Sequence, residues 1–405
     1  MTKNNWTEEI LRDLVDIKHG FAFQGEFFTD EETKEILLTP GNFAIGGGFK
    51  DDKLKYYFGE VPDEYVLSPQ DLIVTMTDLS KNMDTLGYSA LVPDKLGKRF
   101  LHNQRLGKVL IRDEKQLDKY FLYYLLRTKD YRNEVKASAS GSVIKHTSPD
   151  RIRNYKFLLP PLLEQHAIAR ILVSLDDKIE LNRSMNVTLK SMAQALFRKM
   201  IMGEDENWKQ GSILEFTNLL SGGTPSTSEE TYWNGNIEWV SAKDVGNVDG
   251  IFLLETEKKI TQSGIENSST KLLPAKTTIV TARGTVGAHC MLGKAMTMNQ
   301  TNYGLKAKEG IGDYFVYFAL SEMVEQLKQQ SYGTIFDTIT TKTFQSAQCI
   351  QPPKEIINEF EKQVTPMMDA VLNHQKQSRT LASLRDTLLP KLISGELKVQ
   401  MKKSD

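Results

Sequence analysis

Hydrophobic residues recur at alternating steps of four and three in two long stretches of the chain. The first stretch runs from Ile168 to Met200 and the second from Phe360 to Leu392. This spacing is typical of α-helices that bury one narrow face against another helix in a coiled coil. The seam positions assigned by the pattern are Leu172, Leu175, Ile179, Asn182, Leu189 and Leu196 in the first stretch, and Val364, Met367, Val371, His374, Leu381 and Leu388 in the second.

Both seams turn polar at the same place in the middle, and the second contains a proline. Asn182 corresponds in position to His374. Pro366 has no counterpart in the first stretch. Because proline lacks the N–H that a helix interior uses, we expect the second helix to be broken near its beginning, with Thr365 as the cap of a restarted helix.

The two stretches are copies of one another. A shift of 192 residues, without a gap, aligns their Pro-Pro steps at Pro160 and Pro352 and continues to the Gly-Glu steps at Gly203 and Gly395. Shorter motifs occur in the same order before each stretch, and this order predicts a tandem duplication of the whole unit. The paired motifs are WTEEILRDL and WKQGSILEF, DLIVTM and TTIVTA, HNQR and MNQT, and GSVIKHTS and GTIFDTIT.

The segments that precede the two helical stretches are predicted to be mixed α/β. Short strand-like runs such as DLIVTM, TTIVTA and YKFLL are separated by loops of Gly, Asn and Ser. Helical patterns begin at Tyr120 and at Tyr314. Each segment, at roughly 150 residues, is long enough to bury a core of its own.

Together these patterns predict an α+β fold, in which two mixed α/β domains in pseudo-twofold arrangement are separated by a long antiparallel coiled coil of two helices. The expected bounds are 1–158 and 205–350 for the domains, and 159–204 and 351–405 for the helical regions. Helices of about 40 residues would be ~60 Å long, which favours mutual packing. The alternative is two ordinary amphipathic helices, each buried in its own domain.

Composition adds little to this picture but excludes some classes of protein. The 405 residues are 40% hydrophobic and 25% charged, with a net charge of −1 and two cysteines. No apolar run approaches the ~20 residues that span a bilayer, and the polar start MTKNNWTEEI is unlike a signal peptide, so we predict a cytoplasmic protein with no membrane partner. The net charge neither predicts nor excludes binding to nucleic acid, which requires only a local basic face.

Motifs of catalysis and metal binding do not occur in the sequence. There is no GxxxxGK[ST], no GxGxxG after a strand, no HExxH, no CxxC pair and no GxSxG elbow. The Pro-Pro steps lack the preceding Asp or Asn and the following aromatic residue that amino-methyltransferases use. We therefore expect no catalytic residue, no metal site and no cofactor in this chain.

Basic and amide side chains collect instead in loops of both variable segments. Arginine and lysine suit guanine edges, and asparagine and glutamine suit adenine edges, so these residues are candidates for DNA binding. An alternative is that Asn103-Gln104 and Asn299-Gln300 hold their own loops through side-chain hydrogen bonds. The candidates are Lys98, Arg99, His102, Asn103, Arg105, Lys145, His146 and Arg151 in the first segment, and Lys243, Arg283, Thr285, Asn299 and Gln300 in the second.

Several motifs together resemble the specificity subunit of a Type I restriction-modification enzyme. The most specific are SVIKHTSPDRIRNYK followed by FLLPPLLEQHAIARIL, then TARGTVG, and SLRDTLLPKLISGEL near the end. The resemblance covers nearly the whole chain. One departure is QPPKEII, which replaces the apolar-PPL-x-EQ pattern typical of the family at the start of the second helix.

The resemblance implies a non-catalytic subunit with two target recognition domains, each reading one half of a split double-stranded DNA sequence. It also implies a coiled coil that docks two modification subunits, which would supply S-adenosylmethionine for adenine methylation. Two restriction subunits would supply ATP- and Mg-dependent translocation and cleavage. The alternatives are the recognition subunit of a two-component Type II-like enzyme and, from a different class, a coiled-coil scaffold that binds no DNA.

Overall fold

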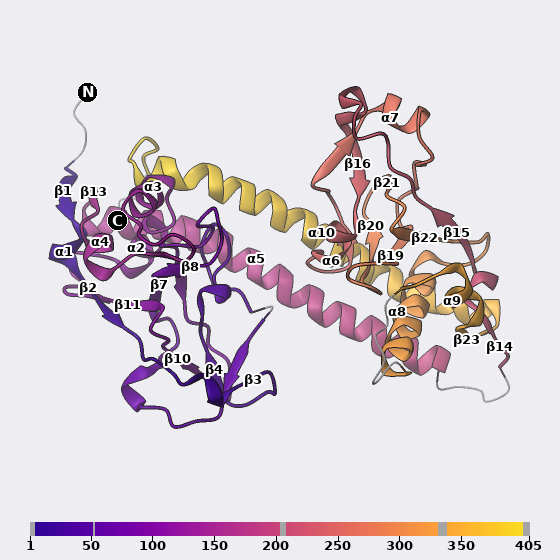
Figure 1. The fold of residues 1–405 in the computed structure, drawn as a ribbon, viewed down its shortest axis with the longest axis horizontal. Helices are drawn as coiled ribbons and strands as arrows, with labels where there is room; N and C mark the ends of the chain where they lie inside the picture. The colour runs from indigo at the N-terminus through magenta and orange to yellow at the C-terminus, as the bar shows by residue number, and fades with distance from the viewer. Residues whose placement is uncertain (1–4, 52, 203–207, 331–337, 400–405) are drawn as a thin grey trace, which may run out of the picture. The chain divides into compact units, whose positions relative to one another are not determined.

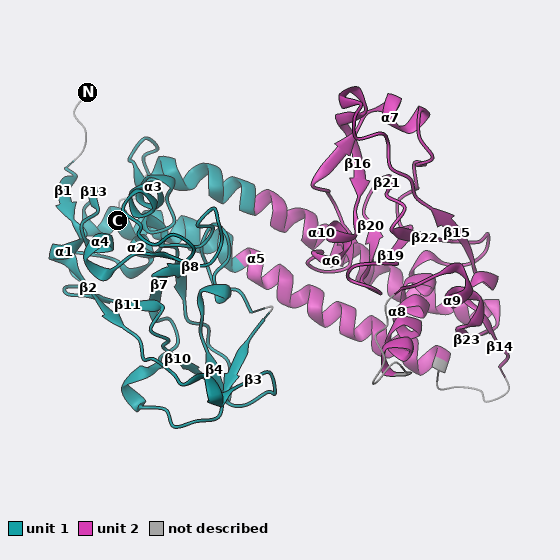
Figure 2. Cartoon of the chain, viewed as in Figure 1, with its two compact units in different colours: residues 1–177, 382–405 teal, residues 178–381 magenta. Residues whose placement is uncertain are grey.

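The computed structural model of the chain describes residues 5–51, 53–202, 208–330 and 338–399. The chain divides into two compact units, shown in Figure 2. Unit 1 comprises Met1–Asp177 with Ala382–Asp405, and unit 2 comprises Lys178–Leu381. Each unit thus contains one mixed α/β part together with a portion of each of two long helices.

Unit 1 is built on a four-stranded antiparallel sheet in the order β2-β11-β7-β9, labelled in Figure 1. A second sheet has the order β3-β5-β4-β10-β6, and two short pairs are β1-β13 and β8-β12. Buried aromatic residues of α2 and α3, such as Phe121 and Tyr131, share one core with Leu72 and Val74 of the sheet. The strands are β1 (Thr7–Ile10), β2 (Val15–His19), β3 (Phe28–Thr29), β4 (Glu35–Leu37), β5 (Lys55–Tyr57), β6 (Val66–Leu67), β7 (Leu72–Thr75), β8 (Thr77–Asp78), β9 (Ser89–Leu91), β10 (Arg99–Leu101), β11 (Leu106–Ile111), β12 (Lys145–His146) and β13 (Lys156–Leu159), and the short helices are α1 (Leu11–Leu14), α2 (Lys119–Leu125), α3 (Lys129–Ala137) and α4 (Pro149–Arg153).

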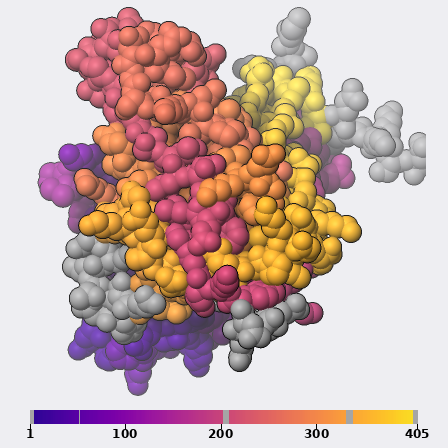
Figure 3. Space-filling model, turned by 90° about the vertical axis from the view of Figure 1, so that its right-hand side faces the viewer, coloured from indigo at the N-terminus to yellow at the C-terminus, as the bar shows by residue number. Residues whose placement is uncertain are grey.

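Unit 2 contains a five-stranded sheet in the order β15-β22-β19-β20-β17, a three-stranded sheet β18-β16-β21 and the pair β14-β23. Figure 3 shows one face of this unit, where its first strands (magenta) lie among later segments (orange). Its elements are β14 (Gln210–Ser212), β15 (Thr217–Ser221), β16 (Trp233–Val240), β17 (Phe252–Leu253), β18 (Lys258–Ile260), β19 (Thr278–Thr281), β20 (His289–Leu292), β21 (Thr297–Met298), β22 (Asn302–Ala307), β23 (Gln348–Ile350), α6 (Ala242–Gly246), α7 (Gln262–Glu266), α8 (Asp313–Gln330) and α9 (Thr341–Ser346).

The duplication seen in the sequence is present in the strand order. The order β2-β11-β7-β9 of unit 1 matches β15-β22-β19-β20 of unit 2, and the pair β1-β13 matches β14-β23. The parallel pair β4-β10 likewise matches β16-β21. Gly20 and Gly222 occupy equivalent places: a Cβ on either would overlap backbone carbonyl oxygens, those of His102 and Asn103 in one unit and of Met298 and Asn299 in the other.

The two long helices, α5 (Leu162–Phe197) and α10 (Lys354–Ile393), pack against each other in antiparallel order inside each unit. In unit 2, the Asn182 amide donates to Ser378 Oγ at 3.2 Å, and His374 Nδ1 bonds to Asn186 Oδ1 at 3.0 Å. In unit 1, Arg385 Nη1 bonds to Asp176 Oδ1 at 2.6 Å.

The predicted seam residues lie on these contact faces. Ala193 and Phe197 of α5 share a core with Phe360, Val364 and Val371 of α10, and Leu189, Leu196 and Met367 pack against its edge. In unit 1, Leu172 shares a core with Leu389 and Leu392, and Leu388 packs against it. The remaining seam positions, Leu175, Ile179 and Leu381, are half-buried.

The expected break at Pro366 is wrong, because α10 continues through it as one helix of 40 residues. Pro366 is exposed, and so is Lys362, whose carbonyl loses its helical donor and can bond to water instead. Val364 and Met368 on the opposite face are fully buried and hold the helix on either side of the proline. The packing therefore outweighs the cost of one missing hydrogen bond.

The predicted fold class, two mixed α/β domains with a pair of long antiparallel helices, is confirmed. The alternative of two helices buried separately in their own domains is wrong, because each unit contains portions of both helices. The domain bounds at 158, 204 and 350 stay a prediction. Helix α5 begins at Leu162 and α10 at Lys354, each directly after its Pro-Pro step.

Candidate nucleic-acid interface

In unit 1, three loops meet at the carboxyl end of the central strand β7. The Met76 N–H donates to the carbonyl of Arg105 at 2.9 Å, and the Thr147 N–H donates to the carbonyl of Met76 at 3.0 Å. Two sets of candidate residues, 102–105 and 145–151, therefore lie at one end of the sheet. We call this arrangement the unit 1 junction.

The loop 102–105 of the unit 1 junction, which joins β10 of one sheet to β11 of the other, is held by its own side chains. Asn103 Oδ1 accepts from the Arg105 N–H at 2.9 Å, and His102 Nε2 bonds to the Leu106 carbonyl at 3.0 Å. The His102 ring is fully buried, and this burial lowers its pKa to about 4. These two residues fit the alternative interpretation, in which polar side chains hold a loop, while Gln104 and Arg105 are exposed.

The second part of the unit 1 junction is the short ribbon β8-β12. His146 Nδ1 bonds to Thr77 Oγ1 at 3.1 Å, and Lys145 Nζ donates to the Gly141 carbonyl at 2.8 Å. Arg151 Nη1 donates to Ser140 Oγ at 2.9 Å. Lys145 and Arg151 thus bond to oxygens of their own loop, and His146 bonds to the neighbouring strand β8.

Asp78, which sequence reasoning missed, orders the loop 76–86 beside this ribbon. Its carboxylate accepts from the N–H groups of Ser80 (2.7 Å), Thr85 (2.5 Å) and Leu86 (2.9 Å). Burial raises the pKa of Asp78, but these hydrogen bonds outweigh burial and hold the pKa below its ordinary value. The only sequence signal for this role is an aspartate followed by serine and threonine in a loop.

Lys98 and Arg99 belong to a different part of unit 1. They lie at the start of β10, whereas His102 follows the end of that strand. Lys98 Nζ pairs with Glu32 at 2.6 Å, and Arg99 pairs with Glu35 at 3.0 Å. Both positive charges are therefore balanced by carboxylates, away from the junction.

Unit 2 forms an equivalent junction at the carboxyl end of β19. The Ala282 N–H donates to the Thr301 carbonyl at 2.9 Å, and the Ile339 N–H donates to the Ala282 carbonyl at 3.0 Å. Thr301 thus takes the place of Arg105. Asn299 Oδ1 accepts from the Thr301 N–H at 3.1 Å, as Asn103 does in unit 1, and Gln300 accepts from the Thr224 hydroxyl.

The turn that follows β19 carries Arg283 and Thr285, both exposed. The Ala288 N–H donates to the Thr285 carbonyl at 3.0 Å, and Gly284 and Gly287 adopt the positive φ values of 81° and 79° that this tight turn requires. Helix α6 lies beside the turn, since a Cβ on Gly246 would lie 3.3 Å from Thr285 Oγ1.

Lys243 of α6 is engaged by a carboxylate. Its Nζ lies 2.6 Å from Glu257, and this hydrogen bond raises the pKa of Lys243. The pair is exposed on both sides, so it contributes little to stability. Lys243 therefore lies near the unit 2 junction, because α6 packs beside the turn, but its charge is balanced by Glu257.

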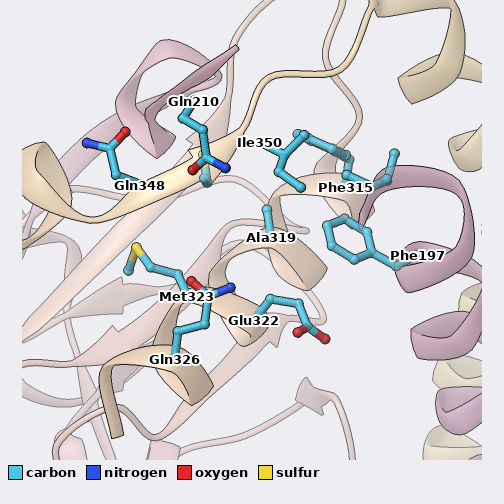
Figure 4. Close-up of a pocket in the computed structure, with 11 residues that line it drawn as sticks. Phe197, Gln210, Phe315, Ala319, Glu322, Met323, Gln326, Gln348 and Ile350 are labelled. Atoms are coloured by element: carbon cyan, nitrogen blue, oxygen red, sulfur yellow. The ribbon is translucent and has the colours of Figure 1, made fainter. Parts of the chain in front are cut away.

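An apolar pocket of about 190 Å³ lies at the end of α5 in unit 2, shown in Figure 4. Phe197, Phe315 and Met323 line it, together with Cys349. Burial raises the pKa of Cys349 to about 12, which disfavours a thiolate. Glu322, the carboxylate in its wall, bonds to Arg198 at 2.7 Å. The pocket therefore offers no acid-base pair. None of the residues that line it belongs to the unit 2 junction.

Searches for two other kinds of site gave no candidate within the described ranges. No group of three or more His, Cys, Asp or Glu side chains there could hold a metal ion. In the same part of the chain, no helix combines the length and apolar character needed to cross a membrane.

Comparison with known proteins identifies the family. The model of the family described as "Type I restriction modification DNA specificity domain" matches residues 3–191 and 205–380. The chain belongs to this family. Each matched segment covers most of one copy of the duplication and contains one junction.

Relatives of known name agree with this assignment. The HindI specificity subunit of Haemophilus influenzae is 24% identical over 68% of this chain and 77% of that protein. The EcoBI specificity subunit of Escherichia coli is 24% identical over 98% of this chain and 87% of that protein. The crystal structure of a Type I S subunit from M. genitalium has the same fold, with a TM-score of 0.59 over 99% of this chain and 98% of that one at 17% identity.

The chain is a DNA specificity subunit of a Type I restriction-modification system. This assignment gives it the recognition of DNA sequence rather than catalysis, as part of a complex that binds DNA. The Type II-like and scaffold alternatives are not favoured. Which side chains contact DNA stays a prediction, and the structure brings the candidates together at two junctions, with Lys98 and Arg99 outside them.

Proposed function

We propose that the subunit reads a bipartite, asymmetric DNA target, with one half-site for each junction. The observation that carries this proposal is the repeated junction: the same backbone hydrogen bonds recur around Met76 and Ala282, while the exposed side chains differ. A common scaffold with different loops suits two half-sites of different sequence. The two copies also match the family separately.

The helix pair is proposed to fix the spacing between the half-sites. Helices α5 and α10 are each continuous through the boundary between the units, at 177 and 381. A helix holds length at about 1.5 Å per residue, so it is a suitable ruler. The antiparallel order would present two similar junctions in opposite directions, as half-sites on antiparallel strands require.

The chemistry is proposed to come from partners. Two modification subunits would dock on the helix pair and bring S-adenosylmethionine, so that an adenine is flipped into their site and methylated. Two restriction subunits would add ATP- and Mg-dependent translocation and cleavage. A cytoplasmic location fits such an assembly and stays a prediction.

Exchange of the mixed α/β part of unit 2 tests the proposal of a bipartite target. Residues 208–350 would be replaced by the corresponding segment of another family member, and methylated adenines would be mapped in genomic DNA of cells with the modification subunits. We expect one half-site to change and the other to remain. A change in both half-sites would contradict independent junctions.

A second experiment tests the helix pair. Four residues inserted in α5 and in α10 should lengthen the spacer by roughly two base pairs. An unchanged spacer would show that the helices do not set the spacing.

A further inference from the structure

Two arginines stand apart from the other charged candidates. Lys98, Arg99 and Lys243 pair with carboxylates, and Lys145 and Arg151 donate to oxygens of their own loops. Within the described residues, the guanidinium groups of Arg105 and Arg283 make no hydrogen bond and no ion pair. Both residues are exposed. An exposed guanidinium that bonds to nothing in its own chain keeps all of its donors for a ligand.

The backbone beside each of these arginines is nevertheless fixed. The Arg105 carbonyl accepts from the Met76 N–H at 2.9 Å, and the Arg105 N–H donates to Asn103 Oδ1 at 2.9 Å. Arg283 directly follows Ala282, whose N–H and carbonyl are both bonded, at 2.9 Å and 3.0 Å. The Thr338 hydroxyl adds a bond of 3.1 Å to the same carbonyl.

Recognition of a DNA base requires both features: a backbone that is fixed and a guanidinium group whose donors are free. A residue that only neutralises phosphate can sit on a mobile loop, because charge attraction is not directional. A bidentate contact to one base edge needs the Cα held in place, since the two N–H groups must meet two acceptors at once. At each junction, an arginine meets both conditions.

We propose that Arg105 and Arg283 each read a guanine through its O6 and N7 atoms in the major groove. The inference rests on the proposed function, in which each junction faces one half-site. Arginine is the commonest reader of guanine, and its planar fork matches these two acceptors. The ligand chemistry is therefore one G·C base pair in each half-site.

The two arginines come from different segments of equivalent junctions. Arg105 lies in the loop between β10 and β11, where unit 2 has Thr301, and Thr301 Oγ1 is bonded to Asn299 at 2.8 Å. Arg283 lies in the turn after β19, where unit 1 has the longer loop 76–86. The guanine should therefore occupy a different position in each half-site, which makes the target asymmetric even though the scaffold is repeated.

The test uses the full chain assembled with its modification subunits and a DNA library randomised across both half-sites. Methylated molecules would be sequenced for the wild type and for Arg105→Ala, Arg105→Lys, Arg283→Ala and Arg283→Lys. We expect each variant to lose about 5- to 150-fold discrimination for one G·C pair, in one half-site only. The lysine variants keep the charge but lack the fork, so they should lose discrimination and retain most of the affinity.

Matched controls are Arg112→Ala in unit 1 and Arg198→Ala in unit 2. Both are exposed arginines whose guanidinium groups bond to carboxylates, of Asp16 and Glu322 respectively. They should leave both half-sites unchanged, and thermal unfolding of every variant should confirm that the assembled protein is folded.

Three outcomes would overturn the inference. An unchanged methylated sequence would mean that the arginines do not read DNA. A uniform loss of affinity for all sequences, with the slope of log K against log salt concentration reduced by about one, would show that the arginines contact phosphate instead of bases. Restored discrimination in the lysine variants would show that charge alone suffices. By contrast, a wild-type target that is not bipartite, or an Arg105 variant that alters both half-sites, would show that the proposed function has failed.

Discussion

Units 1 and 2 differ in the loop that follows the central strand, β7 in unit 1 and β19 in unit 2. Two hydrogen bonds frame this loop equivalently: the Gly87 N–H donates to the Thr75 carbonyl, and the Gly287 N–H donates to the Thr281 carbonyl. Between them, unit 1 has the long loop 76–86 and unit 2 the short turn 282–286. The duplicated frame is thus the same in both units, whereas the length and the side chains of the loop between its strands differ.

The units also differ in how they hold the long helices. In unit 1, the half-buried Asp176 of α5 accepts from the Tyr124 hydroxyl at 2.7 Å and pairs with Arg127 at 3.0 Å, besides its contact with Arg385. In unit 2, Asp369 of α10 accepts from the Tyr314 hydroxyl at 2.9 Å, and its side chain is 49% exposed. A tyrosine-aspartate contact recurs, and in unit 1 the aspartate also pairs with the buried Arg127.

The strongest test of the shared frame is steric. Gly20→Ala and Gly222→Ala should each destabilise their unit by about 4 kcal/mol or more, because the added Cβ overlaps backbone carbonyls that cannot move aside. Gly25→Ala, which meets nothing within 4 Å, is the control. Urea unfolding would measure all three. If only one of the first two variants were destabilised, the frames would not be equivalent.

The different contacts of Asp176 and Asp369 predict that substituting them lowers the free energy of unfolding by unequal amounts. Asp176→Ala should cost about 3–5 kcal/mol, because it leaves the buried Arg127 without its carboxylate. Asp369→Ala should cost less, about 1–2 kcal/mol, since it removes the half-exposed ion pair with Lys276 and the hydrogen bond from the Tyr314 hydroxyl. Unfolding free energies of both variants would check the contrast, and equal losses would refute it.

A still smaller effect should depend on pH and should be confined to unit 2. Burial raises the pKa of Glu361 to about 7 from its ordinary value of 4.5, although its carboxylate accepts from the Phe315 N–H at 2.5 Å. A raised pKa favours the neutral acid in the folded state, so this contribution to stability is complete below about pH 4.5 and lost as pH rises through 7.

Comparing the wild type with Glu361→Gln in urea from pH 4.5 to 8 would measure this contribution. The glutamine variant resembles the neutral acid, so its advantage should grow by about 2 kcal/mol across the range. A constant difference between the two proteins would mean that Glu361 titrates normally. Unit 1 has Ala169 at the position related by the shift of 192 and should show no such dependence.

The elements that sequence predicted well are those set by local periodicity. The runs DLIVTM and TTIVTA are β7 and β19, and the helical pattern at Tyr314 is the single helix α8. The similar pattern at Tyr120 is split into α2 and α3, because Thr128 adopts an extended conformation as the N-cap of α3. Such a split depends on tertiary contacts, here those of the adjacent Arg127 with α5.

The candidate site was less accessible to sequence reasoning. Composition can mark His102 and Arg105 as polar loop residues, but it cannot show that the first is buried and the second exposed. Equally, nothing in the sequence pairs Lys98 with Glu32, because that contact depends on the folded sheet. Pro366 was misjudged for the same reason, since the burial of its neighbours decides the outcome.

The polar middle of the helix pair restricts how α5 and α10 can align. Asn182 meets Ser378, and Asn186 meets His374, in two successive layers. Sliding α10 by seven residues in one direction would keep the apolar positions in contact but place Val371 opposite Asn182. A buried amide without a partner costs about 1–3 kcal/mol, so an apolar seam that tolerates sliding acquires a single favoured registration at its centre.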